Sequence, residues 1–126
     1  MTPADRFAKL SDLLSDDADL LRRGRWLDVD CRIDIGAEAF HLTIAQGALA
    51  AFDRGPRLMR STVFTVRATD EAWSHHWRRM PAPGWHDLFA LSKRGEMAFD
   101  GNLQPFLAHL QYIKDVVTLP RAGGVR

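Results

Sequence analysis

The stretch that decides the fold is Gly95-Glu96-Met97-Ala98-Phe99-Asp100-Gly101-Asn102. Two glycines enclose a short run from Glu96 to Asp100, which predicts a strand because glycine readily forms the turns at which a strand begins and ends. Asn102 is a residue type favoured as a helix cap. The apolar residues after it recur at helical spacing: Leu103, Phe106, Leu107, Leu110, Ile113 and Val117. The segment therefore predicts a strand that turns directly into a last helix.

Two further helices are predicted just before this strand. The first begins at Thr69-Asp70-Glu71, where a capping hydroxyl precedes carboxylates that favour the positive end of a helix. Its apolar residues are spaced to form one stripe: Trp73, Trp77 and Met80. Pro81 and Pro83 end it. The second is a short helix over Trp85 to Lys93.

Four strands are predicted nearer the N-terminus. Apolar residues alternate with polar ones from Val29 to Ile35 and from Phe40 to Ile44, as in strands with one buried face. A turn at Gln46-Gly47 leads into a third strand, Ala48 to Phe52, and Ser61 to Ala68 forms a fourth. Because strands and helices are largely segregated, we expect an α+β fold in two layers. A five-stranded, mostly antiparallel sheet would be covered by helices on one face.

The first residues predict an amphipathic helix over Pro3 to Arg23, with Thr2 as its cap. Its apolar residues again follow helical spacing: Phe7, Leu10, Leu13, Leu14, Leu20 and Leu21. We therefore expect residues 1–26 to form an N-terminal helix that packs on a domain over residues 27–120. Residues 121–126 are expected to be a disordered tail.

Composition excludes several classes of protein. The chain has 126 residues, enough for one domain, and its net charge of +1 argues against a dedicated nucleic-acid binder. The lone Cys31 cannot form an internal disulfide, which favours a reducing compartment. No apolar run is long enough to cross a membrane, and charges stand where a signal peptide needs apolar residues. A cytoplasmic location is therefore predicted.

From Leu27 onward the order of elements resembles the sterol carrier protein type 2 family. The most specific part is the strand and helix cap at Gly95 to Asn102. The turn at Gln46-Gly47, the strand Val63 to Val66 and the acid-led helix at Thr69-Asp70-Glu71 support it. The resemblance covers most of the chain and rests on combined order and spacing, since no single piece is diagnostic.

The resemblance implies an apolar tunnel between a five-stranded sheet and its helices. Family members bind sterols, fatty acids, acyl-coenzyme A esters or related lipids, with no catalytic residue and no cofactor. Carried over to this chain, the ligand-binding residues would be Phe64, Val66, Trp73, Trp77, Leu88, Phe89, Met97, Phe99, Phe106, Leu107 and Leu110. The chain departs from the pattern by its leading helix and by a middle segment rich in Trp and His. Either departure would narrow or fill the tunnel.

The leading functional prediction is therefore non-catalytic binding or transfer of a lipid, fatty acyl or steroid-like molecule. The alternative is an accessory or interaction subunit with the same fold and a filled core, serving a separately encoded enzyme. A solid core beside Trp73 and Phe89 would favour that alternative. A small enzyme of the polyketide-cyclase kind fits less well, because such folds end on long strands whereas this chain ends on a helix. The sequence leaves open a homodimer, an enzyme partner and a transient contact with a membrane surface.

The tryptophans and histidines allow more than one interpretation. Trp73, Trp77 and Trp85 would form a rigid wall for a flat apolar ligand or simply fill the core. A metal site is not predicted, because the adjacent His75 and His76 would point about 100° apart on a helix. We expect these two histidines at the surface or at the mouth of a pocket, where one could bind a ligand's polar head.

Two other features complete the sequence-based expectations. Cys31 alternates with apolar residues on the buried side of its strand, where a thiol is normally an inert packing group rather than a nucleophile. His41 and Thr43 share the opposite, polar side with Arg32 and Asp34. That face is expected to meet solvent, another protein or a second subunit.

Overall fold

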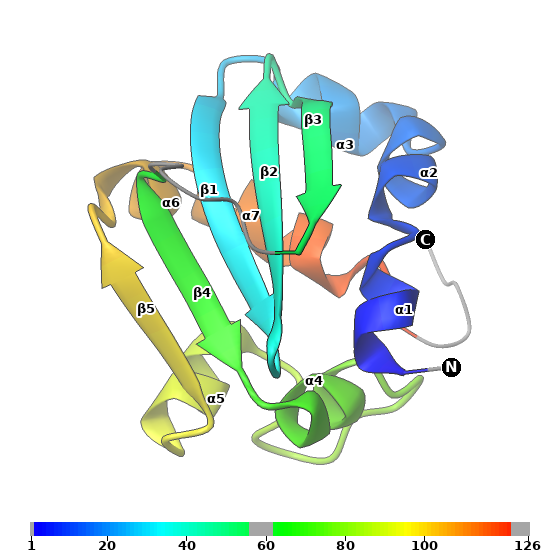
Figure 1. The fold of residues 1–126 in the computed structure, drawn as a ribbon, viewed down its shortest axis with the longest axis vertical. Coiled ribbons are helices and arrows are strands. Elements are labelled where there is room, and N and C mark those ends of the chain that lie inside the picture. The colour runs from blue at the N-terminus through cyan, green and yellow to red at the C-terminus, as the bar shows by residue number, and fades with distance from the viewer. Residues whose placement is uncertain (1, 56–61, 122–126) are drawn as a thin grey trace.

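The fold is built on one open sheet of five strands, seen in a computed structural model that describes residues 2–55 and 62–121. The strands are β1 (Asp28–Ile35), β2 (Glu38–Ala45), β3 (Ala48–Arg54), β4 (Phe64–Ala68) and β5 (Met97–Gly101). Their order across the sheet is β3-β2-β1-β4-β5. Neighbouring strands run antiparallel except β1 and β4, which run parallel (Figure 1). The predicted mostly antiparallel α+β architecture is confirmed.

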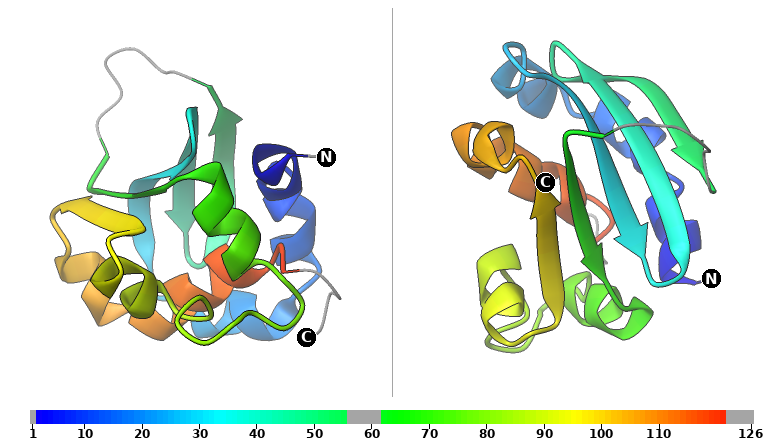
Figure 2. Two further views of the ribbon diagram at one scale, coloured as in Figure 1. Left: turned by 90° about the horizontal axis from the view of Figure 1, so that it is seen from below. Right: turned by 60° about the vertical axis from the view of Figure 1, so that its left-hand side comes forward.

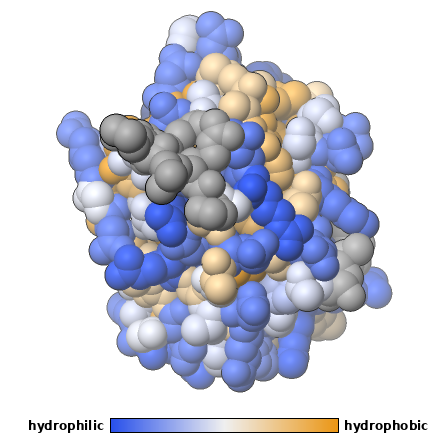
Figure 3. Space-filling model, in the orientation of Figure 1, coloured by the Kyte–Doolittle hydropathy of each residue, from blue (hydrophilic) through white to orange (hydrophobic). Residues whose placement is uncertain are grey.

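Short helices cover one side of this sheet. They are α1 (Pro3–Phe7), α2 (Leu10–Ser15), α3 (Ala18–Arg23), α4 (Asp70–His76), α5 (Leu88–Lys93), α6 (Gln104–Ala108) and α7 (Leu110–Thr118). Figure 2 shows α3, α6 and α7 together on the same side of the strands. The opposite side carries no helix over the described residues, and Figure 3 shows hydrophilic residues on this face beside an apolar area towards its upper right. No helix in residues 2–55 and 62–121 is long and apolar enough to cross a membrane.

The predicted leading helix is in fact three helices. α1 ends at Phe7, and α3 starts anew after Asp17, whose carboxylate accepts a hydrogen bond from the Leu20 amide at 3.0 Å. The helical spacing of apolar residues continues through these breaks, so periodicity alone did not reveal them. The physical cause of the second break is the aspartate side chain, which caps a new helix start.

The other helices also differ from the prediction at their ends. α4 ends at His76, so Met80 does not continue the Trp73–Trp77 stripe and is 86% exposed. α5 begins at Leu88 rather than at Trp85, because Asp87 caps it by accepting a hydrogen bond from the Phe89 amide. The last helix is interrupted at His109, whose backbone angles (φ −120°, ψ 35°) are not helical.

The bounds of the strands and the start of the C-terminal tail differ less from the prediction than the helix ends do. β3 runs to Arg54, two residues past the predicted end, and the described part of the fourth strand starts at Phe64. Ser61, where that strand was predicted to begin, lies outside the described residues, as do residues 122–126 of the predicted tail. Arg121 does not belong to a loose tail, because its guanidinium donates hydrogen bonds to the His76 carbonyl at 2.9 and 3.1 Å.

The alternation in β1 sorts its side chains between the core and the polar face, as predicted. Its inward residues are buried: Val29, Cys31, Ile33 and Ile35. On the other face, Arg32 pairs with Asp34 at 2.7 Å. His41 departs from the expectation of an open polar face, since it is only 3% exposed. It lies on β2 between Arg32 of β1 and Asp53 of β3, whose side chains flank it in register.

A turn between β2 and β3 packs closely against α3, and this contact gives a test of the fold. Gly47 has φ +82°, and a Cβ added there would lie 2.6 Å from the carbonyl carbon of Gly24. Gly95 has a similar φ of +78°, but nothing lies within 4 Å of an added Cβ. Gly95→Ala should therefore cost about 1 kcal/mol of backbone strain, and Gly47→Ala at least about 2 kcal/mol more. Urea denaturation of both variants measures the difference. Equal losses would mean that α3 yields freely to the new methyl group.

Candidate functional site

The predicted tunnel residues divide into three groups by burial. Seven are buried: Phe64, Val66, Trp73, Trp77, Leu88, Met97 and Phe106. Phe89, Phe99 and Leu110 are half-buried and pack against the core. Leu107 is 55% exposed, so the expectation that it faces the interior is wrong. The interruption at His109 separates α6 from α7, and Phe106 rather than Leu107 is the buried residue of α6.

The interior near α1 and α4 is filled by aromatic rings. The Trp73 and Trp77 rings stack with centroids 5.0 Å apart, and Phe7 of α1 stacks on Trp77 at 5.9 Å. Phe7 also meets the Phe40 ring of β2 edge-on at 4.9 Å. Both indole N–H groups are bonded: Trp73 donates to the Asp34 carbonyl at 2.9 Å, and Trp77 to a carbonyl of α7 at 2.8 Å. The leading segment therefore closes this end of the interior.

The interior near β5 holds a second group of rings, which we call the phenyl cluster: Phe89 of α5, Phe99 of β5 and Phe106 of α6. Ring centroids lie 5.9 Å apart for Phe89 and Phe99, 6.3 Å for Phe89 and Phe106, and 5.1 Å for Phe99 and Phe106. Phe106 is the only buried residue of α6, whereas Phe89 and Phe99 keep part of their surface exposed. The phenyl cluster is thus an apolar region that the fold covers incompletely.

A polar pair borders the phenyl cluster. The Lys114 ammonium on α7 lies 2.7 Å from an Asp87 carboxylate oxygen and 4.7 Å from the centroid of the Phe89 ring. Burial alone would raise the pKa of the Asp87 carboxyl, but the hydrogen bond and charge of Lys114 and the α5 amides lower it below its usual value. Sequence reasoning missed this pair. The available signal was a lysine four residues after Leu110, on the same side of the last helix.

His76 joins three segments inside the protein. Its Nδ1 lies 2.9 Å from the Trp85 carbonyl, and its Nε2 lies 3.1 Å from the Thr118 hydroxyl. Because a carbonyl only accepts, Nδ1 carries the proton in the neutral ring. Burial lowers the pKa of His76 to about 4, against a raising effect of the Trp85 hydrogen bond. The expectation that His76 lies at the surface or at a pocket mouth is wrong, because it is fully buried.

Cys31 and His75 are the remaining candidate groups from the sequence. Burial raises the pKa of Cys31 to about 12, so its thiol is an inert packing group, as predicted. The His75 ring is tilted against the Trp85 ring with centroids 4.4 Å apart, and its Nε2 lies 3.8 Å from a Glu71 carboxylate oxygen. In the part of the chain that the structure describes, no three His, Cys, Asp or Glu side chains gather to hold a metal ion.

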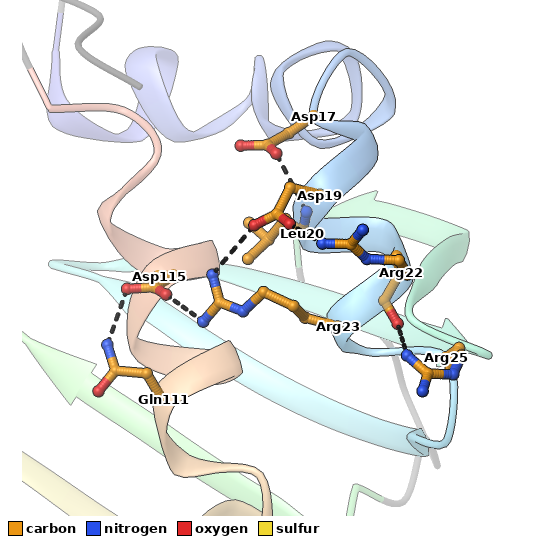
Figure 4. Close-up of polar contacts among 8 residues, drawn as sticks. All are labelled: Asp17, Asp19, Leu20, Arg22, Arg23, Arg25, Gln111 and Asp115. Carbon is orange, nitrogen blue, oxygen red and sulfur yellow. Dashed lines mark hydrogen bonds and ion pairs between the residues drawn. The ribbon is translucent and has the colours of Figure 1, made fainter.

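Two hollows on the described surface lie apart from most of the predicted tunnel residues. The first, of about 620 Å³, is lined by Asp34, Gly36, Arg67, Ala68, Thr69, Asp70, Glu71, Gly95, Glu96, Met97 and Ala98. The second, of about 570 Å³, lies beside α3 and α7. Figure 4 shows the ion pairs at its edge, where Arg23 reaches Asp19 at 3.8 Å and Asp115 at 2.5 Å. Of the predicted tunnel residues, these hollows include Met97 alone.

Comparison with known proteins identifies the fold. No family model and no curated sequence matches the chain. A crystal structure of sterol carrier protein 2 aligns over 94% of this chain and 95% of its own, with a TM-score of 0.71 and 12% identity. Palmitated SCP2L2 from Aedes aegypti aligns over 93% of this chain and 95% of its own, with a TM-score of 0.60 and 15% identity. The UbiJ-SCP2 ubiquinone synthesis protein aligns over 90% of this chain and 85% of its own, with a TM-score of 0.58 and 19% identity. The chain therefore has a two-layer α+β fold shared with these proteins. More particularly, this is the sterol carrier protein 2 fold, as predicted from the order and spacing of the elements.

Proposed function

We propose that the protein binds or transfers a long apolar molecule, such as a lipid, a fatty acyl chain or a steroid-like compound, at the phenyl cluster. The observation that carries the proposal is the incomplete burial of Phe89 on α5 and Phe99 on β5, whose rings meet edge-on. Apolar rings left partly exposed next to a core favour contact with an apolar partner. The shared fold of the palmitated SCP2L2 protein supports the same reading.

The way into this region would lie beneath α6. Phe106 alone anchors that five-residue helix in the core, and non-helical backbone flanks it at Gly101 (φ +92°) and His109. A small outward movement of α6 would therefore uncover the Phe99 ring. Ligand binding would be driven by burial of apolar area, worth about 25 cal/mol per Å² before the entropy of association is subtracted. No catalytic residue is required, and we propose that the protein is not an enzyme and acts in the cytoplasm.

A pair of matched variants tests the proposal. Phe99 of β5 and Phe52 of β3 are both half-buried phenylalanines, and they lie on the two opposite edge strands of the sheet. Phe99→Ala should weaken binding of a fluorescent long-chain fatty acid or sterol by about five- to tenfold, because it removes contact area from the phenyl cluster. Phe52→Ala should leave the affinity unchanged while costing comparable stability. Energy transfer from the tryptophans to the fluorescent ligand measures both affinities.

Two outcomes would contradict this function. Absence of binding across fatty acids, sterols and acyl esters would remove the carrier proposal altogether. Equal weakening by Phe52→Ala and Phe99→Ala would move the site away from the phenyl cluster.

A second candidate is an accessory role beside a separately encoded enzyme. It is favoured by the aromatic filling around Phe7 and Trp77, which leaves that end of the interior solid. The UbiJ-SCP2 ubiquinone synthesis protein, named for a biosynthetic pathway, shares the fold. Native mass spectrometry of freshly purified protein separates the candidates. A retained small molecule supports binding at the phenyl cluster, whereas a ligand-free protein that forms a defined complex with an enzyme supports the accessory role.

A further inference from the structure

Lys114 is largely buried, which is unusual for a lysine. It lies on α7 four residues after the half-buried Leu110, and its side chain is only 19% exposed. Its ammonium stands over the face of Phe89, a member of the phenyl cluster, at 4.7 Å. Most of the lysine stem is therefore held among apolar groups while the charge sits at their edge.

The Asp87 carboxylate leaves part of this ammonium available. Asp87 accepts hydrogen bonds from the Phe89 amide at 3.1 Å and from Lys114 at 2.7 Å, so its charge is already compensated by its own helix and by the lysine. An ammonium group carries three donors, of which Asp87 uses one. The exposed part of Lys114 can therefore donate to a second acceptor.

The local charge favours an anion as that acceptor. Besides Lys114, two cationic side chains flank the segment 84–87: Arg94 lies over the Trp85 ring at 4.4 Å, and Arg121 donates to the His86 carbonyl at 3.3 Å. Among the described residues, Asp87 is the carboxylate that pairs with any of these three cations. An incoming anionic group would meet a net positive environment next to an apolar one.

We propose that Lys114 binds the acidic head of an amphiphilic ligand whose chain lies against the phenyl cluster. The inference rests on the proposed function and names its ligand class: a long apolar chain with a carboxylate or phosphate at one end. A charge-assisted hydrogen bond from the half-buried ammonium would hold the head. Phe89, directly beneath the ammonium, would meet the first carbons of the chain.

Competition with a fluorescent fatty acid tests the head-group site. Palmitate, hexadecyl phosphate and hexadecanol share one chain length and differ in the head. The wild-type protein should bind both acidic ligands about tenfold more tightly than the alcohol. Lys114→Met should abolish that preference while the alcohol still binds, and Lys114→Arg should keep it. Lys93→Met, which removes an exposed lysine at the end of α5, is the matched control and should also keep it.

The outcomes separate the two proposals. Equal affinity of the wild-type protein for all three ligands would overturn the head-group site and leave the proposed function standing. A preference that survives Lys114→Met in a folded protein would overturn the head-group site as well. Failure of all three ligands to bind would overturn the head-group site, and the proposed function would fall with it only if sterols and acyl esters also failed to bind. The wild-type comparison needs no variant, so equal affinities would overturn the head-group site even if Lys114→Met did not fold.

Discussion

Phe7→Ala is expected to lower the free energy of unfolding by about 3–5 kcal/mol, the usual cost of emptying a buried phenylalanine site. Phe7 is completely buried and contacts rings from both layers: Trp77 from the helices, and Phe40 and Phe52 from the sheet. Urea or thermal denaturation of the variant measures the loss. Leu107→Ala is the control, because a side chain that is 55% exposed should change stability by about 0.5 kcal/mol or less.

Phe7→Ala also tests why the interior near α1 and α4 is filled by side chains. If the leading segment closes a tunnel that the fold would otherwise contain, Phe7→Ala should bind fluorescent apolar ligands more tightly, or bind more of them, than the wild-type protein. A stability loss below about 1 kcal/mol would show that neighbouring rings collapse into the space. That outcome would contradict the role given to Phe7.

Acidification from about pH 6.5 to about pH 4 is expected to remove about 3 kcal/mol of stability through His76. In the unfolded chain His76 takes up its proton near the ordinary pKa of 6.5, whereas burial lowers the pKa in the folded protein to about 4. The unfolded state therefore binds the proton first as the pH falls. The contribution of His76 is fully present above pH 6.5 and is lost between 6.5 and 4.

Denaturation curves recorded across this pH range measure the effect. His76→Gln should flatten the dependence, because glutamine cannot take up the proton, although it will lower stability at neutral pH. His86→Gln, at an exposed position nearby, should retain the slope. An unchanged slope in His76→Gln would assign the acid sensitivity to other groups.

The fold could be predicted because its signals are local. Alternating burial in β1 and the short strand after Gly95 depend on neighbours in sequence. The first was found as predicted, and the second lies one residue later than predicted, over Met97–Gly101. Helix ends were predicted less well. The break at Asp17 comes from a side chain that captures a backbone amide, and the break at His109 from a single non-helical residue, neither of which disturbs apolar spacing.

The candidate site depended on contacts between distant residues, which the sequence does not display. Whether Trp77 lines a space or fills it was decided by Phe7, seventy residues away in the chain. His76 became buried because Trp85 and Thr118 supply its hydrogen bonds. Lys114 gained its position over Phe89 through the packing of α7 against α5. Each of these residues has an ordinary local pattern, so only the tertiary structure distinguishes it.

The parallel pairing of β1 with β4 divides the sheet between the two halves of the chain. Strands from the first half of the chain lie on one side of this central junction, and strands from the second half lie on the other. Phe7, Phe40 and Phe52, which pack together at one end of the interior, come from the first half of the chain, whereas every member of the phenyl cluster comes from the second. If a ligand binds at the phenyl cluster as proposed, insertions or substitutions before residue 55 would change the rings around Phe7 and leave the lining of that site unaltered.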